Sequence, residues 1–396
     1  MPNELSKSHS PQLILGLLVL AASASIMSTD LYAPSLPHLP KFFGTSPELV
    51  KLTMSLNLLG YALAQLFYGP ISDRYGRRPV IIGGMGAFCV CALGCALAQS
   101  IEQLILARVL LGTSAAAQAV MGYAILYDVF EKKERVRALA ILGIALSVTP
   151  AVAPLLGGYI HVLFGWRVNF FVVFGIGSLA TLLIVSWLPE TNRNRSEALA
   201  LVQVLHYYAE LLGNREFMQY ALITGLVLGA IFAFITAGPF IYIDRLGVAT
   251  QHFGFYYGAT VFGYIVGSMI ARQMTSRLSV QTLLQGGLAL SLIGCVLIVQ
   301  QIYTGSLTSV GLSISVGVMF AGLGPVFAVA PVLALEATSS RAGAGAALLG
   351  SIELLTASLA ALGVSIFHDG SARPFAVIVS SMMCLAWIVF RTTRTA

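Results

Sequence analysis

Charged residues are scarce in this chain: only 10% of its 396 residues are Asp, Glu, Lys or Arg, whereas 57% are hydrophobic. A typical soluble domain has about a quarter of its residues charged, so the composition excludes an ordinary soluble fold. A helix that crosses the ~30 Å apolar core of a bilayer needs about 20 mostly apolar residues. The sequence supplies twelve such windows, which predict an all-α polytopic membrane protein with twelve transmembrane helices. The expected spans are 13–37, 50–69, 79–99, 103–126, 138–160, 168–188, 217–243, 252–273, 281–302, 308–334, 343–366 and 374–391.

Motifs of enzyme chemistry are missing as well. The sequence contains no HExxH, no GxSxG elbow and no Walker A lysine loop. Its five cysteines all fall inside predicted spans without metal-binding spacing, and none of its six histidines has another histidine at i+4. We therefore predict neither an enzyme nor a metal or cofactor site. Energy for any transport has to come from outside the chain, and an ion gradient is the obvious source.

Basic residues are unevenly distributed between the predicted loops. If the N-terminus is cytoplasmic, sixteen Lys and Arg residues fall on the cytoplasmic side and five on the outer side. This bias satisfies the positive-inside rule for an even number of spans with both termini cytoplasmic. It also accounts for the formal net charge of +6, so nothing indicates a nucleic-acid partner. The cytoplasmic set is Lys7, Arg74, Arg77, Arg78, Lys132, Lys133, Arg135, Arg137, Arg193, Arg195, Arg215, Arg272, Arg277, Arg341, Arg391 and Arg394, and the outer set is Lys41, Lys51, Arg167, Arg245 and Arg373.

The beginning of the chain loosely resembles a signal peptide. Lys7 precedes an apolar stretch at 13–20, and small residues follow at 22–24. Cleavage there would leave an odd number of spans and invert the charge asymmetry. We therefore expect this segment to remain as the first span.

The longest polar interval inside the chain, 189–216, lies between the sixth and seventh spans. It predicts an N-terminal six-helix bundle at 1–190 and a C-terminal six-helix bundle at 216–396. A cytoplasmic linker at 191–215 would join them. Equal halves of this kind favour two pseudo-symmetric bundles related by an axis along the membrane normal.

Three ionisable residues lie well inside predicted spans: Asp30 in the first, Arg108 in the fourth and Glu353 in the eleventh. An ionisable group at membrane depth costs roughly 2.5 to 3.5 kcal/mol on insertion scales, so it usually marks a pathway for ions, protons or charged substrates. Burial opposes a charged carboxylate and a nearby guanidinium favours it, which is the balance that a proton switch needs. We predict that all three residues take part in proton coupling.

Each of these residues also has a structural interpretation. Asp30 could lie at a helix end near the outer surface, because Pro34 and Pro37 follow it closely. Arg108 could extend its long side chain to the membrane interface. Glu353 could serve only in structural pairing.

Small residues favour an inward-facing Arg108. Steps of four and three along the fourth span give Arg108, Gly112, Ala115, Ala119 and Gly122. Such a stripe lets a neighbouring helix backbone approach closely. The arginine then points into the bundle, and we favour this placement over the interface.

The fifth span carries glycine, serine and proline along much of one side. Proline removes a backbone donor and bends a helix, whereas glycine and serine permit close helix contact. We predict an interface where the two halves rock, although glycine and proline are generally common in membrane helices. The residues are Gly143, Ser147, Pro150, Pro154, Gly157 and Gly158.

Polar and aromatic side chains at helical spacing supply candidate walls for a substrate cavity. An apolar, aromatic cavity with a few polar groups suits amphipathic drug-sized ligands. Single aromatic residues in membrane helices often face lipid or the interface instead. The predicted substrate-binding residues are Asp30, Asn57, Tyr61, Gln65, Gln118, Tyr123, Phe232, Phe234, Tyr256 and Tyr257.

Four motifs resemble those of the major facilitator superfamily. The string GPISDRYGRRP at 69–79 resembles the superfamily signature between the second and third spans. The string DLYAPSLP at 30–37 resembles the D-x-Y-x-P-x-x-P motif of the bicyclomycin/chloramphenicol-resistance subfamily of drug:proton antiporters. Residues 108–112 resemble its R-x-x-x-G motif. Residues 154–158 resemble the antiporter motif G-P-x-x-G-G, with Ala153 in place of the first glycine.

The resemblance implies a twelve-span antiporter of the bacterial inner membrane that exports drug-like lipophilic compounds in exchange for protons. Asp30 would take part in proton and substrate coupling, and Arg108 would support it. We expect a monomer without a cofactor, whose partners are a small-molecule substrate, protons and the lipid bilayer. The implied cytoplasmic gate comprises Gly69, Asp73, Arg74, Gly76, Arg77 and Arg78, with Asp73 attracted to the start of the eleventh span near Gly343.

Two other functions stay open at this stage. The same fold could import a metabolite by proton symport or export a dedicated natural product such as a siderophore. A membrane receptor or enzyme without transport is the remaining class, and the missing catalytic motifs and missing soluble domain make it remote.

Overall fold

The computed structural model is all-helical throughout the residues it describes, which are 10–192, 201–338 and 342–393. The basic residues Lys7, Arg193, Arg195, Arg341 and Arg394 of the charge analysis lie outside these ranges. The helices are α1 (Pro11–Asp30), η2 (Ala33–His38), α2 (Leu39–Phe43), α3 (Pro47–Tyr75), α4 (Arg77–Leu97), α5 (Ile101–Val129), α6 (Lys132–Phe164), α7 (Trp166–Trp187), α8 (Leu201–Gly213), α9 (Arg215–Pro239), η3 (Phe240–Arg245), η4 (Thr250–His252), α10 (Phe253–Met274), α11 (Val280–Tyr303), α12 (Ser309–Glu336), α13 (Ala342–Ile366) and α14 (Arg373–Thr393).

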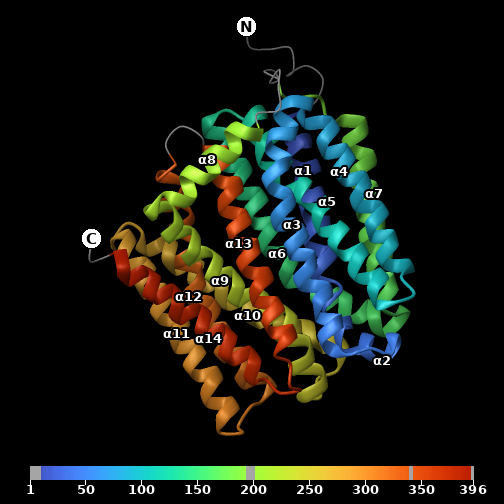
Figure 1. Cartoon of the computed structure of the whole chain (residues 1–396), viewed down its shortest axis with the longest axis vertical. Coiled ribbons are helices and arrows are strands. Elements are labelled where there is room, and N and C mark those ends of the chain that lie inside the picture. Colours follow the sequence, from blue (N-terminus) through green and yellow to red (C-terminus); the bar gives the residue numbers. More distant parts are fainter. Residues whose placement is uncertain (1–9, 193–200, 339–341, 394–396) are drawn as a thin grey trace.

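Twelve helices of the described chain are long and apolar enough to cross a membrane, as the sequence predicted. Helices α1 and α3 to α7 form the first half, and α9 to α14 form the second (Figure 1). Helix α8 lies at one end of the bundle, which we call the linker side. The opposite end, which we call the far side, carries η2, α2, η4 and the segment 367–372.

Several helices begin at residues that satisfy their own first N–H groups. The side chains of Ser10, Ser46, Ser100 and Ser279 each accept a hydrogen bond from the backbone N–H three residues later. These groups have no partner within the helix, so a capping hydroxyl stabilises the start by about 1 kcal/mol. The helix starts therefore follow local side-chain chemistry rather than the edge of the apolar run.

Helices α3 and α6 are longer than the predicted spans. Helix α3 continues to Tyr75 and α6 begins at Lys132, so both extend beyond their apolar segments on the linker side. Hydropathy locates the part of a helix that lies in the membrane and does not locate its polar ends. The first span also differs, because α1 ends at Asp30 and Pro34 and Pro37 lie in the short 3₁₀ helix η2.

Glycine permits the close packing of α5 on α3. A Cβ atom on Gly112 would lie 2.0 Å from the backbone oxygen of Asn57, so no larger residue fits without movement of one helix. The predicted close approach at this stripe is confirmed at Gly112. Gly122, ten residues further along α5, has nothing within 4 Å of a built Cβ atom.

These two glycines make a matched pair for a stability measurement. We expect Gly112→Ala to lower the unfolding temperature in detergent, because α3 and α5 have to separate. We expect Gly122→Ala to leave it unchanged or raise it slightly, because alanine favours helix at a site with room for its methyl group. Equal behaviour of the two variants would show that the close approach at Gly112 does not contribute to stability.

The two halves meet along two helix pairs. Helix α3 packs against α13, and α6 packs against α10 and η4. A hydrogen bond of 3.0 Å from Gln65 Nε2 to Ser351 Oγ and one of 2.7 Å from Ser358 Oγ to the oxygen of Ser55 connect α3 and α13. A built Cβ atom on Gly158 of α6 would lie 2.6 Å from the backbone oxygen of Thr250 in η4, and one on Gly254 of α10 would collide with the backbone of Leu155 in α6. Helix α6 therefore touches η4 and the start of α10 on the far side.

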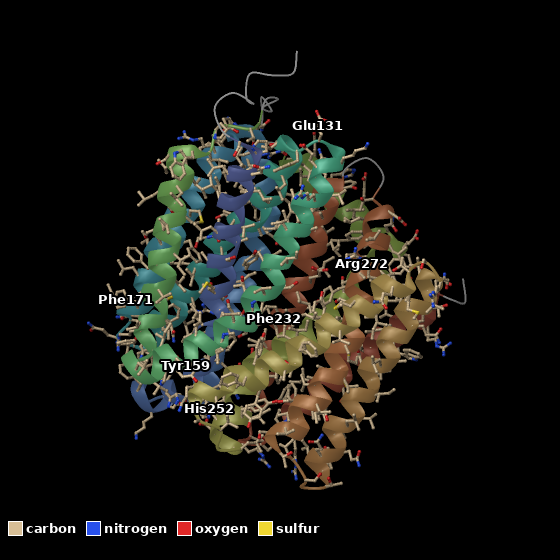
Figure 2. The ribbon with its side chains drawn as sticks, turned by 180° about the vertical axis from the view of Figure 1, so that it is seen from behind. Glu131, Tyr159, Phe171, Phe232, His252 and Arg272 are labelled. Atoms are coloured by element: carbon tan, nitrogen blue, oxygen red, sulfur yellow. The ribbon has the colours of Figure 1, made fainter. Side chains whose placement is uncertain are left out.

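Helices α6 and α10 diverge toward the linker side. In Figure 2, Tyr159 and His252 lie close together near the far side, whereas Glu131 and Arg272, at the other ends of these helices, are widely separated. On this face of the bundle the two halves therefore touch on the far side and are splayed apart on the linker side.

Candidate functional site

Asp30 is the last residue of α1 and only 4% of its surface is exposed. The following residues of η2 are also buried, so they cover Asp30 from the far side. Within the described chain its carboxylate has no hydrogen bond and no ion pair. It interacts electrostatically with Arg108 of α5 and with Tyr257 of α10. Asp30 thus lies inside the bundle, where the two halves meet, and not at the outer surface.

Arg108 is completely buried, with 0% of its surface exposed. Its Nη1 donates to the backbone oxygen of Ser28 at 2.7 Å, and its Nε donates to the backbone oxygen of Thr53 at 3.3 Å. Its guanidinium carbon also lies 5.1 Å from the ring centroid of Tyr32. The alternative of a side chain that extends to the membrane interface is therefore wrong. Arg108 thus connects α5 to α3 and to α1, which it contacts at Ser28, two residues before Asp30.

Several of the predicted pocket residues have structural partners. The amide of Asn57 donates to the backbone oxygen of Arg108 at 2.7 Å, and Gln65 bridges α3 and α13 as described above. Phe234 is fully buried in α9, stacked on Tyr257 at a centroid distance of 5.9 Å. Contrary to the expectation of a cavity wall, Phe234 belongs to the packed core of the second half in this structure.

A small cavity of about 60 Å³ lies between α1, α3, α5 and α6. Three predicted pocket residues line it: Tyr61, Gln118 and Tyr123. Gln118 is buried, and neither its amide nitrogen nor its amide oxygen has a hydrogen-bond partner in the described chain. Most of the remaining lining is apolar. Gln118 is therefore a polar group without a described partner on the wall of a mostly apolar cavity.

Glu353 of α13 lies across the bundle from this cavity. It interacts with Thr224 of α9 and electrostatically with Tyr123 of α5. Tyr123 is 48% exposed, although it belongs to the inner face of the first half. Phe232 and Tyr256, the other predicted pocket residues, are partly buried. Glu353 and Tyr123 therefore come from different halves and interact through the middle of the bundle.

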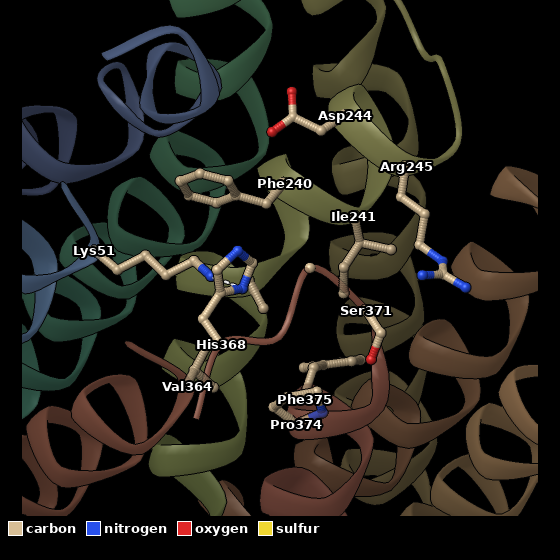
Figure 3. A pocket seen from close by; sticks show the side chains of 12 residues that line it. Lys51, Phe240, Ile241, Asp244, Arg245, Val364, His368, Ser371, Pro374 and Phe375 are labelled. Atoms are coloured by element: carbon tan, nitrogen blue, oxygen red, sulfur yellow. Dashed lines mark hydrogen bonds between the residues drawn. The ribbon is translucent and has the colours of Figure 1, made fainter. Parts of the chain in front are cut away.

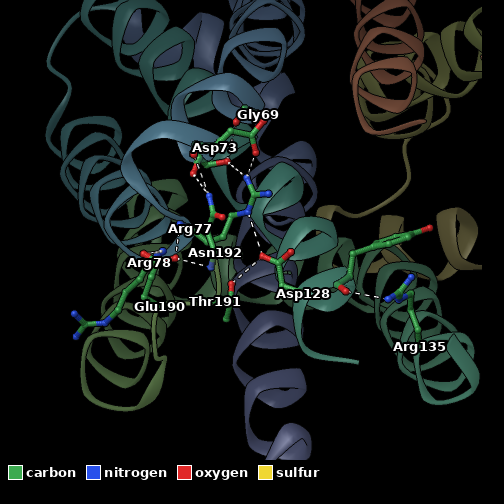
Figure 4. Close-up of polar contacts among 11 residues, drawn as sticks. Gly69, Asp73, Arg77, Arg78, Asp128, Arg135, Glu190, Thr191 and Asn192 are labelled. Carbon is green, nitrogen blue, oxygen red and sulfur yellow. Dashed lines mark hydrogen bonds and ion pairs between the residues drawn. The ribbon is translucent and has the colours of Figure 1, made fainter. Parts of the chain in front are cut away.

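The loop between α3 and α4 carries a network of charges on the linker side (Figure 4). Arg77 forms ion pairs with Asp73 at 2.6 Å and with Asp128 of α5 at 3.3 Å. The carboxylate of Glu190 accepts hydrogen bonds from the backbone N–H groups of Arg77 and Arg78 at 2.9 Å and 3.3 Å. Gly76 supplies the turn with a φ of 101°, a conformation that favours glycine.

These contacts all lie within the first half of the molecule. The guanidinium carbon of Arg74 lies 5.3 Å from the ring centroid of Tyr75. The backbone oxygen of Gly69 accepts a hydrogen bond from the hydroxyl of Ser72, which lies one turn later in α3. Asp73 pairs with Arg77 in this splayed arrangement, whereas the sequence predicted an attraction to the start of α13. Residues 339–341, just before that helix, lie outside the described part of the chain.

The prolines of α6 do not interrupt it, since the helix runs from Lys132 to Phe164 with Pro150 and Pro154 inside it. A Cβ atom on Gly157 would lie 2.0 Å from the backbone oxygen of Leu31 in its own half. One on Gly158 would lie 2.6 Å from the backbone oxygen of Thr250 in the other half. This glycine pair thus touches both halves next to Asp30.

Sequence reasoning missed four residues that join the halves on the far side. His38 Nε2 lies 2.8 Å from Thr250 Oγ1, and Lys51 Nζ lies 2.6 Å from His368 Nδ1. The charge pattern predicts Lys51 in an outer loop, but it lies in the second turn of α3 and is 1% exposed. Its partner lies 317 positions away, and no local pattern indicates such a pair.

Comparison with known proteins agrees with this architecture. The model of the "Major Facilitator Superfamily" matches residues 18–391. A "Chloramphenicol resistance protein" of Pseudomonas aeruginosa is 30% identical over 84% of this chain and 81% of its own length. A "Bicyclomycin resistance protein homolog" of Haemophilus influenzae is 28% identical over 97% of both chains. The crystal structure of a D-xylose-proton symporter superposes with a TM-score of 0.78, at 14% identity, over 96% of this chain and 97% of that one.

The likeness to the symporter shows only a shared fold, because the two sequences are only 14% identical. The family model covers nearly all twelve spans, and the relatives align along most of their lengths. Together these findings indicate a transporter and not an enzyme. The chain belongs to the Major Facilitator Superfamily.

Proposed function

We propose that this protein is a drug:proton antiporter that exports lipophilic compounds across the bacterial inner membrane by alternating access. The observation that carries the proposal is Asp30, a buried carboxylate at the meeting point of the two halves that has no ion pair among the described residues. A buried charge of this kind is energetically costly, so it usually marks a pathway for ions or protons. Both termini and α8 would then lie in the cytoplasm, and the far side would face outward.

The proposed cycle uses Asp30 for proton and substrate in turn. With the linker side open, the deprotonated carboxylate and the cavity at Tyr61 and Gln118 accept a neutral or cationic compound. Outward opening exposes Asp30 to external protons, and protonation removes the charge that favoured the substrate. Arg108 holds the end of α1 through Ser28 and tunes the charge of Asp30. Glu353 supplies a second carboxylate from the other half.

The proposed substrate class follows from the cavity lining and from the names of the relatives. Apolar residues with isolated polar groups favour shape and hydrophobic area over one fixed set of hydrogen bonds. Relatives are named for chloramphenicol and bicyclomycin resistance. On the linker side, Asp73, Arg74, Arg77 and Arg78 would form the gate that closes when α13 approaches the loop between α3 and α4.

A flux measurement in inverted membrane vesicles tests this proposal. We expect chloramphenicol to accumulate in vesicles that contain the protein only while their interior is acidic, and to leak out once a protonophore collapses the gradient. Accumulation driven by the opposite gradient would indicate a proton symporter instead. Proton-coupled transport of a single compound from a chemically varied panel, with none for the others, would indicate a dedicated natural-product exporter.

A further inference from the structure

Lys51 is a buried cation in the contact between the two halves on the far side. It belongs to α3, in the first half, and its Nζ lies 2.6 Å from Nδ1 of His368, which follows α13 in the second half (Figure 3). The same nitrogen lies 4.5 Å from the ring centroid of Phe240, at the start of η3. A buried ammonium is costly without partners, so these two groups support it.

The chemistry of the two groups fixes the protonation of His368. An ammonium has only donors, so Nδ1 of His368 has to accept the hydrogen bond from Lys51. That requires a neutral imidazole with its hydrogen on Nε2. A protonated imidazole has donors on both nitrogens. Protonation of His368 would therefore replace an attractive contact by repulsion between two cations.

The groups around this contact add charges of both signs. Glu48 is in the first turn of α3, Asp369 follows His368, and Asp244 and Arg245 come from η3. Burial first and Lys51 second lower the pKa of His368 below its ordinary value of 6.5, and Glu48 and Asp369 oppose this shift. Asp244 interacts with Lys51.

A cavity of about 160 Å³ lies beside the contact, so water can reach it from the far side. Lys51 is its lining residue from the first half, and the second half contributes others, including Asp244, His368 and Ser371. The polar groups Asp244 and Arg245 are exposed at its rim. A proton from the far-side solution therefore has a short route to His368 that does not pass Asp30.

We propose that the contact between Lys51 and His368 is a proton-released latch of the outer gate, and hence a proton-binding site separate from Asp30. The inference rests on the proposed function, in which the far side faces outward and must open in each cycle. Opening separates α3 from the segment after α13 and so has to break this contact. External acid breaks it by protonating His368.

The sign of the pH effect follows from the two states of the gate. In the closed state burial and, second, Lys51 depress the pKa of His368, and in the open state the imidazole is free of both. The latch stabilises the closed state fully above about pH 6.5, the ordinary pKa of histidine. This stabilisation is lost progressively as the external pH falls below that value toward the depressed pKa.

Electron–electron distance measurements on the far side test the latch. Spin labels on Lys41→Cys, in the first half, and Ser306→Cys, in the second, report the opening of the far side. Both native residues are exposed, and serines replace the two accessible cysteines, Cys91 and Cys384. Asp30→Asn is present throughout, so that the titration of Asp30 does not contribute to the readout.

In this background we expect the ratio of open to closed molecules to rise by up to about tenfold from about pH 8 to about pH 5.5. The limit is tenfold because about pH 5.5 lies one unit below the ordinary histidine pKa of about 6.5, and one unit corresponds to a factor of ten. His368→Gln keeps a side-chain acceptor for Lys51 but cannot be protonated, so it should keep the far side closed and flatten the response. Lys51→Met should open the far side already at high pH. His206→Gln, which changes an exposed side chain of α8, is the matched control and should behave as the parent.

If the open-to-closed ratio of His368→Gln depended on pH in the same way as that of the parent, the latch would be overturned. A response of Lys51→Met equal to that of the parent would also overturn it. Neither result bears on the antiporter itself, which is judged separately from proton-driven flux in protein with Asp30 intact. Absence of that flux with a normal latch would in turn contradict the proposed function alone.

Discussion

Asp30→Asn is expected to reduce proton-driven accumulation of substrate in inverted vesicles to the level of vesicles without the protein. Asparagine matches aspartate in size but carries no charge and binds no proton, so the proposed exchange of proton and substrate at one site is lost. Substrate affinity should also lose its dependence on pH. Facilitated movement of a neutral substrate down its own gradient should remain, because the fold and the cavity are unchanged.

The matched control is Glu102→Gln, which neutralises an exposed carboxylate in the first turn of α5. This variant should transport like the wild type. If Asp30→Asn kept both the proton-driven accumulation and the full pH dependence of affinity, the coupling carboxylate would have to be another residue. Glu353 would then be the first to examine.

Arg108→Met is expected to abolish transport and to destabilise the protein by about 2 to 5 kcal/mol. Methionine fills similar space but removes the hydrogen bonds that the guanidinium donates to the backbone oxygens of Ser28 and Thr53 in a dry interior. Arg108→Lys should rescue little, because a single ammonium cannot match the fork of the guanidinium. The unfolding temperature in detergent and vesicle transport measure the two effects.

Arg135 provides the control for this substitution. It also donates to two backbone oxygens, those of Tyr127 and Phe130, but at the linker-side surface. Water can replace it there, so Arg135→Met should change the unfolding temperature little. Equal losses in the two variants would show that burial of Arg108 is not the source of its effect.

The spans could be predicted because the membrane imposes a length of apolar sequence on each of them. Their ends could not, because a helix continues into water as long as local capping and turn residues allow. Helix α3 passes through Ser72 and Asp73 and ends only at Gly76, where the backbone adopts a positive φ. Pro34 and Pro37 indicated a helix end near Asp30, but the burial of the 3₁₀ helix that follows depends on packing against the second half.

Asp30 and Arg108 could be found in the sequence because each is a charge inside an apolar run. Their relation could not, since Arg108 contacts the backbone of α1 and not the carboxylate itself. Lys51 escaped detection for the opposite reason: it follows a polar turn, where hydropathy assigns a lysine to a loop. Phe234 and Tyr123 look alike in sequence, and only the packing of their helices makes one a core residue and the other exposed.

The hydrogen bonds of Glu190 bear on how the protein is made. Helix α4 starts after Gly76, which has no side chain to satisfy the first N–H groups, and these groups of Arg77 and Arg78 donate to Glu190 instead. That carboxylate is synthesised more than a hundred residues later, after α7. During membrane insertion the first N–H groups of α4 therefore lack this acceptor until the sixth span has been synthesised. Loss of Glu190 should lower the yield of mature protein more than the turnover of the molecules that do mature.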